Sequence, residues 1–87
     1  MVIKFFGPFE KLAEKVVRIG LKESISTQEM LHMLASRYPG FARYSTKTND
    51  AELSAHVMVI RNGAPLKLAD RIEDNDRIDI LLPVTGG

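Results

Sequence analysis

Two glycines, Gly86 and Gly87, follow Pro83 and an apolar segment at the end of the sequence. Glycine lacks a side chain and accepts almost all backbone angles, so Val84-Thr85-Gly86-Gly87 could enter a slot too narrow for bulkier residues. A C-terminal carboxyl has a reference pKa of about 3.3–3.7 and is ionised at neutral pH. Such a carboxylate can attack the α-phosphate of a bound nucleotide and become an acyl-adenylate. The segment therefore indicates chemistry at Gly87, and a frayed chain end is the alternative interpretation.

Other catalytic or metal chemistry has little support in the side chains. The two histidines, His32 and His56, stand in no recognisable Ser/His/Asp setting and are a poor basis for a transition-metal site. The chain has no cysteine, which excludes disulfides, thiolate metal sites and cysteine nucleophiles. The acidic run 73–76 lacks the spacing of a calcium loop, and no glycine-rich phosphate loop is present. We expect no bound cofactor and no metal.

Length and charge limit the class of protein. The chain has 87 residues, enough for one domain over 1–87 with a flexible C-terminal tail at 83–87. Twelve Lys and Arg against eleven Asp and Glu give a net charge of +1. This balance lacks the excess of positive charge that binding to nucleic acid or to an anionic membrane requires. No apolar run approaches the roughly 20 residues of a membrane span. The first residues lack the layout of a signal peptide, so we expect a soluble cytoplasmic protein.

The clearest predicted element is a helix over 27–37. Ser26 and Glu29 have the spacing of a capping box, and Ile25 and Met30 that of a hydrophobic staple. Tyr38-Pro39-Gly40 ends the helix. Before it, strands at 2–6 and 16–21 form a hairpin-like pair, joined by a helical turn at 9–15.

The second half of the chain predicts three more strands. Residues 41–53 are polar and mixed, and we expect a loop that a helical turn at 41–44 could open. A strand at 56–61 leads to Asn62-Gly63, the pair typical of a type I′ hairpin turn, and to a return strand at 66–68. A turn at 73–76 precedes the last strand, 77–82. The order β-β-α-β-β-β indicates an α+β domain whose sheet is covered by one main helix.

Alternation along the first and last strands predicts which face of the sheet is open. Ile3 and Phe5 share one face of the first strand, and the last strand places Ile78, Ile80 and Leu82 on one face and Arg77, Asp79 and Leu81 on the other. Charged side chains belong on the uncovered face. This places Phe6 and Leu81 beside them, exposed on what could be neighbouring strands. We interpret the pair as a docking patch, and neutral surface or a covering loop is the alternative.

Four segments together resemble the ubiquitin-like sulfur carriers of the MoaD/ThiS family: KFFGPFEKLA, the capped helix, HVMVIRNG and RIDILLPVTGG. The resemblance covers nearly the whole chain. Its most specific part is the end, where the family has an apolar strand, one or two prolines and then Val-small-Gly-Gly. Leu82-Pro83 stands where many relatives have Pro-Pro. The length and the segment 41–55 fit the MoaD type, and the chain also resembles archaeal ubiquitin-like modifiers.

The resemblance implies a β-grasp fold and a role at the chain end. In this family a ubiquitin-activating-type adenylyltransferase uses ATP to adenylate the terminal glycine, and sulfur transfer makes a thiocarboxylate. The MoaD type inserts its tail into the large subunit of molybdopterin synthase, where the sulfur passes to a pterin precursor of molybdenum cofactor. By motif position Gly87 is the acyl group, and the partner-binding residues are Phe6, Leu81, Pro83, Val84, Thr85 and Gly86. Such a chain is a synthase subunit that is not catalytic alone.

Two other functions stay open at this point. A ubiquitin-like modifier would be joined to substrate lysines through Gly87, and a plain binding module would have an incidental tail. The sequence does not decide between carrier and modifier, because both need the same Gly86-Gly87 end.

Overall fold

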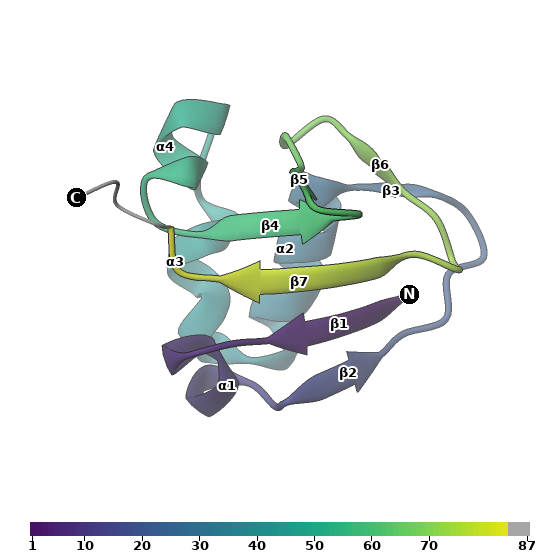
Figure 1. Cartoon of the computed structure of the whole chain (residues 1–87), viewed down its shortest axis with the longest axis horizontal. Coiled ribbons are helices and arrows are strands. Elements are labelled where there is room, and N and C mark those ends of the chain that lie inside the picture. The colour runs from purple at the N-terminus through teal and green to yellow at the C-terminus, as the bar shows by residue number, and fades with distance from the viewer. Residues whose placement is uncertain (84–87) are drawn as a thin grey trace.

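The computed structural model describes residues 1–83, and residues 84–87 lie outside the described part. Its main sheet has the strand order β2-β1-β7-β4-β5. The strands are β1 (Val2–Phe5), β2 (Val16–Arg18), β4 (Met58–Arg61), β5 (Ala64–Pro65) and β7 (Arg77–Leu81). β1 and β7 pair in parallel, and the other pairs are antiparallel. The main helix α2 (Thr27–Arg37) crosses one face of this mixed sheet (Figure 1), which confirms the predicted α+β class.

The two faces of β1 and β7 follow the predicted alternation up to Leu81. Ile3, Phe5, Ile78 and Ile80 are buried against the helices, and their neighbours face the open side. The prediction for Leu82 is wrong. Its side chain is 50% exposed, because the strand ends at Leu81 and Pro83 cannot donate a further ladder hydrogen bond.

Helix α2 begins and ends where the sequence predicts. Ser26 Oγ accepts a hydrogen bond from the Glu29 amide at 3.0 Å, and Glu29 Oε1 accepts one from the Ser26 amide at 3.2 Å, so the capping box is present. Met30, Leu31 and Leu34 are fully buried and attach the helix to the sheet. The short helix α1 (Pro8–Leu12) packs Phe9 into the same core and stops before the predicted end of the helical turn at residue 15.

The prediction of a loop over 41–53 is largely wrong. The segment contains the end of the 3₁₀ turn η1 (Pro39–Phe41), then α3 (Ala42–Ser45), and most of α4 (Asp50–Ser54). The predicted helical turn at 41–44 corresponds to α3. Helix α4 forms because Asn49 caps it, accepting a hydrogen bond from the Glu52 amide at 2.8 Å, and because Leu53 is buried in the core.

The hairpin at Asn62-Gly63 is confirmed, but its return strand lies earlier than predicted. Asn62 and Gly63 have φ of 52° and 78°, as a type I′ turn requires. Such a two-residue turn restarts pairing immediately, so β5 is Ala64–Pro65 and not 66–68. Leu66 and Leu68 are instead buried in the core.

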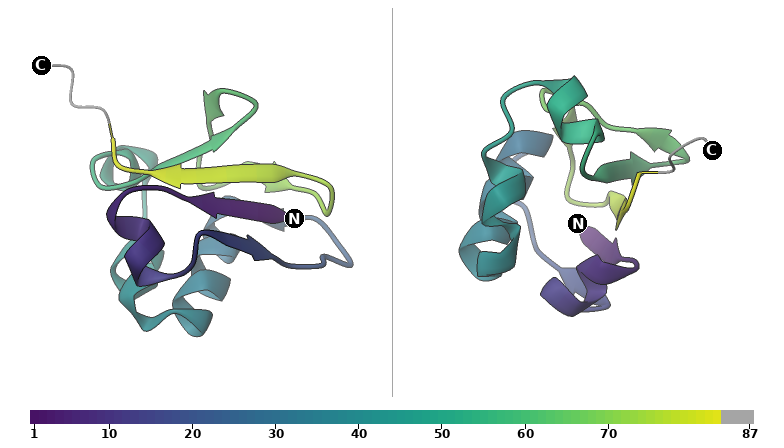
Figure 2. Two further views of the ribbon diagram at one scale, coloured as in Figure 1. Left: turned by 60° about the horizontal axis from the view of Figure 1, so that its bottom comes forward. Right: turned by 90° about the vertical axis from the view of Figure 1, so that its left-hand side faces the viewer.

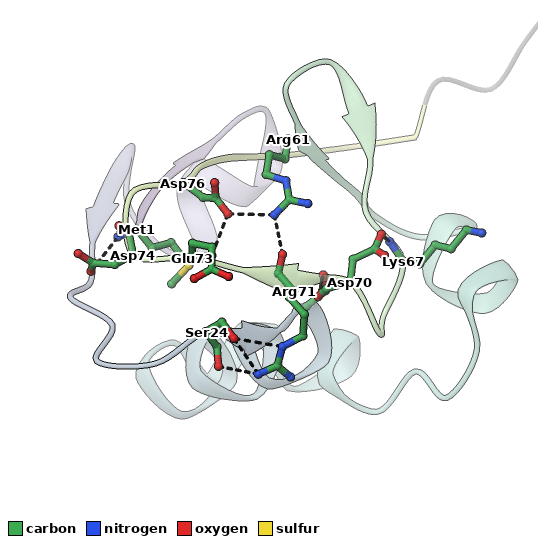
Figure 3. A network of polar contacts seen from close by, with 10 residues as sticks. Met1, Ser24, Arg61, Lys67, Asp70, Arg71, Glu73, Asp74 and Asp76 are labelled. Carbon is green, nitrogen blue, oxygen red and sulfur yellow. Dashed lines mark hydrogen bonds and ion pairs between the residues drawn. The ribbon is translucent and has the colours of Figure 1, made fainter.

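A second, two-stranded sheet was not predicted. β3 (Ile25–Ser26) pairs antiparallel with β6 (Arg71–Ile72), next to the N-terminus of α2. Polar contacts hold this region to the main sheet (Figure 3). Arg61 Nη1 of β4 donates to the Arg71 carbonyl of β6 and, at 2.9 Å, to Asp76 Oδ2, while Arg71 Nη2 donates to the Ser24 carbonyl at 2.7 Å.

Candidate functional site

A row of apolar side chains crosses the open face of the sheet at the end where β7 finishes. β1 and β7 are paired through Phe5 and Ile80, and the Phe6 amide donates to the Ile80 carbonyl at 2.9 Å, so Phe6 stands beside Leu81. Leu81 is in turn paired with Met58 of β4. Phe5, Ile80 and Val59 point into the core, so Phe6, Leu81 and Met58 face the other side. We call these three residues the apolar row.

The structure places Phe6 and Leu81, the two residues of the predicted docking patch, side by side. Phe6 is 46% exposed, and Leu81 and Pro83 are half-buried. Val84, Thr85, Gly86 and Gly87, the other predicted site residues, lie outside the described residues. Met58 was missed, because residues 57–60 are all apolar and their alternation does not reveal which side chain is outward.

A groove of about 590 Å³ lies at the same end of the domain, lined by residues of α3, of the segments on either side of α4 and of the segment after β7. Figures 1 and 2 show these parts of the chain at one end of the domain. Its lining residues are Arg43, Tyr44, Lys47, Ala55, His56, Leu82 and Pro83. We call this the basic groove. Leu82 and Pro83, the last two described residues, line this groove. Leu81 belongs to the apolar row, so the neighbouring residues Leu81 and Leu82 face two different surfaces.

An aromatic cluster fixes the wall of the basic groove. Tyr44 of α3 is buried and packs against Phe9 and Phe41, with ring centroids 5.3 and 5.5 Å apart. Phe41 also packs on Phe5 of β1, at 5.5 Å. Such edge and tilted arrangements are favourable for aromatic rings. Because Tyr44 is anchored in the core, the neighbouring Arg43 is held at the surface, where it is exposed.

Of the two cationic side chains in the basic groove, only Lys47 has an ion-pair partner among residues 1–83. Lys47 Nζ lies 3.7 Å from Glu52 Oε1 of α4, whereas Arg43 makes no ion pair with any residue of 1–83. His56, which the sequence left without a function, is exposed on the rim. Sequence reasoning missed this groove because it assigned Arg43 and Lys47 to a polar loop. The signal available was Asn49 with Glu52, which marks the start of α4.

Among residues 1–83 there is neither a metal-ligand cluster nor a membrane-spanning helix. Within 1–83 no three His, Asp or Glu side chains are grouped so that they could hold a metal ion. In the same part of the chain, every helix is too short or too polar to cross a membrane.

Comparison with solved structures defines the class of protein. SAMP1 from Haloferax volcanii superimposes with a TM-score of 0.74 at 26% identity, over 99% of this chain and 97% of that one. A candidate molybdopterin converting factor subunit 1 from Pyrococcus furiosus gives 0.75 at 20% identity, over 95% of both chains. The HVO 2177 protein of Haloferax volcanii gives 0.76 at 25% identity, over 99% of this chain and 84% of that one. The fold is thus the β-grasp fold of ubiquitin-like proteins.

The family follows from the sequence itself. The ThiS family model matches residues 3–87, and this chain belongs to the ThiS family. A search of curated proteins finds no significant match. The resemblance expected from the four segments is confirmed, and the structural neighbours include both a molybdopterin factor and an archaeal modifier.

Proposed function

We propose that this protein is a sulfur carrier whose Gly87 is adenylated and then converted to a thiocarboxylate, for use in molybdopterin biosynthesis. The observation that carries the proposal is the family match, which extends through Gly86-Gly87 a few residues beyond Leu81 of the apolar row. Within this proposal the chain is the small subunit of molybdopterin synthase, in the cytoplasm. Its partners are a ubiquitin-activating-type adenylyltransferase and the large synthase subunit.

The chemistry needs only the carboxyl end of this chain. The Gly87 carboxylate attacks the α-phosphate of ATP on the activating enzyme, and pyrophosphate leaves. A sulfide nucleophile then attacks the acyl carbon, AMP leaves with the former carboxylate oxygen, and a thiocarboxylate remains. Residues 83–87 span at most about 18 Å when extended, at 3.3–3.6 Å per residue. That reach places the reacting carbon inside a partner while the β-grasp body contacts its surface.

The test is an intact-mass measurement after incubation with the activating enzyme, ATP and a sulfur source. We expect a product heavier by the difference between one sulfur and one oxygen atom, and none when ATP is omitted. Deletion of Gly86-Gly87 serves as the control that abolishes the product. An unchanged mass with an enzyme known to be active on another carrier would count against the sulfur-carrier role.

Conjugation to proteins is a second candidate function, favoured by the match to SAMP1, a small archaeal modifier protein, at 26% identity. In this role a lysine amine replaces sulfide as the attacking group, and an isopeptide bond to Gly87 results. Cells expressing a tagged chain would then contain Gly-Gly remnants on lysines of other proteins after digestion. Their absence, together with a thiocarboxylate on the purified chain, would leave the carrier role alone.

A further inference from the structure

The basic groove has the chemistry of a binding surface that the apolar row does not share. Its lining includes the apolar Leu82 and Pro83, the cationic Arg43 and Lys47, and the polar ring of His56. A hollow of about 590 Å³ is large enough for several side chains. It is fixed from within by Tyr44, so it exists before any partner arrives.

The charges of this groove identify the kind of group that it accepts. Lys47 already pairs with a carboxylate, that of Glu52, at 3.7 Å. Arg43 is exposed and has no such partner among residues 1–83. A guanidinium presents a planar fork of donors that matches a carboxylate, which makes an acidic side chain the complementary group.

We propose that the basic groove binds an acidic segment of the activating enzyme, with an Asp or Glu carboxylate on Arg43 and an apolar side chain against Leu82 and Pro83. The inference rests on the proposed function, and it holds for carrier and modifier alike, since both roles begin with activation of Gly87. Binding of the enzyme at the basic groove would add to its contact with the apolar row and would orient the chain end toward the active site.

The position of the groove argues against the nucleotide as its occupant. In the proposed reaction the α-phosphate meets Gly87, which is four residues beyond Pro83. The groove, which includes Pro83, therefore faces the enzyme's protein surface at the entrance of its active site. A nucleic acid is also disfavoured, because the chain carries a net charge of only +1 and the groove has two cationic side chains, one of them paired.

The test measures ATP-pyrophosphate exchange by the activating enzyme as the concentration of this chain is varied, with wild type, Arg43→Gln and Arg43→Glu. We expect the KM for the chain to rise about tenfold or more for R43E and less for R43Q, with kcat nearly unchanged, because the charge acts on association. The difference between wild type and R43E should shrink at 1 M salt, where the Debye length is about 3 Å.

Lys22→Glu is the matched control. It makes the same change in charge, at an exposed residue between β2 and β3, at the end of the domain opposite the end of β7 (Figure 1). Its KM should stay within about twofold of wild type. Thermal unfolding of each variant checks that Arg43 substitutions leave the fold intact, and the salt dependence of wild type is a second readout that needs no variant.

Four other results would contradict the inference, and each of them has a different explanation. Equal KM values for wild type, R43E and K22E would mean that the groove takes no part in binding, while the proposed function stands. A higher KM for ATP alone would assign the groove to the nucleotide. A lower KM for R43E would mean that the groove holds this chain's own carboxyl end. If wild type supports no exchange at all, the proposed function fails and this inference falls with it.

Discussion

At the scale of single residues, the apolar row places the exposed Phe6 beside the half-buried Leu81 and Met58 on the open face of the sheet. Phe6 directly follows β1, Leu81 ends β7 and Met58 begins β4, and they meet only because β1 and β7 are parallel neighbours and β4 pairs on the other side of β7. Nearby open-face positions carry charge, as at Lys4, Arg77 and Asp79. A contiguous apolar strip within a charged face is typical of an interaction surface.

Substitution Phe6→Asp should weaken binding to the partner that receives the chain end. We expect a loss of about 1–3 kcal/mol, roughly 5- to 150-fold in Kd by calorimetry, because an aromatic anchor would be replaced by a charge. The free energy of unfolding should change little, since Phe6 is 46% exposed. Leu12→Asp, at a site that is 39% exposed in α1, is the control that should leave binding unchanged. Equal losses for both variants would remove the apolar row from the interface.

Asp76 makes stability depend on acid pH. Hydrogen bonding to the Glu73 amide at 2.8 Å lowers the pKa of Asp76 below its ordinary value of 3.8, and Arg61 adds to the effect (Figure 3). A carboxyl with a lower pKa in the folded state stabilises the fold above its unfolded pKa, and the contribution disappears as pH falls through the folded value.

Substitution Asp76→Asn should therefore lower the free energy of unfolding by about 1 kcal/mol at pH 7. The difference from wild type should persist down to about pH 4 and shrink at lower pH, as the wild-type carboxyl becomes protonated. Urea unfolding at a series of pH values measures it. The exposed Glu23→Gln is the control, and a difference that grows as pH falls would contradict the assignment.

At the scale of elements, α2 depends on its first turn as much as on its buried face. The capping box satisfies two amides that the helix would otherwise leave open, and hydrogen bonding to Ser26 lowers the pKa of Glu29. The same segment carries β3, which pairs with β6, so the cap also fixes where the second sheet begins.

Substitution Ser26→Ala should lower the free energy of unfolding by about 1 kcal/mol, as is usual for the loss of an N-cap. Ser54→Ala, which removes a hydroxyl that donates to the Ala51 carbonyl at the end of α4, should change it by less than about half of that. Urea denaturation of wild type, S26A and S54A measures these free energies of unfolding. Equal stabilities of S26A and wild type would mean that the cap contributes nothing.

The sequence predicted those elements whose signals are local. A capping box marked α2, alternation marked β1 and β7, and Asn62-Gly63 marked a hairpin. The two-residue strands β3 and β6 carry no periodicity, because they are defined by pairing between residues far apart in the chain. The short helix α4 was not predicted because the residues around it are mostly polar, although the cap at Asn49 and the burial of Leu53 stabilise it. As a result the apolar row was predicted in part and the basic groove was not.

At the scale of the whole molecule, the last described residues leave the domain between two unlike surfaces. The apolar row lies on the open face of the sheet, and the basic groove lies between α3, the segments on either side of α4 and the segment after β7. Burial of Ile78 and Ile80 anchors β7 in the centre of the sheet, so the end of this strand at Leu81 is attached to the core. In the proposed function, this body would position the chain end against a partner that supplies the catalysis.

The central claim is that the carboxyl group of Gly87 is the reacting group. The measurement is formation of an acyl-adenylate from labelled ATP by the activating enzyme, with wild type and with a variant that carries one added tryptophan after Gly87. We predict a stoichiometric adenylate on wild type and none on the extended chain, while both have the same unfolding temperature. An adenylate of equal yield on the extended chain would contradict the account.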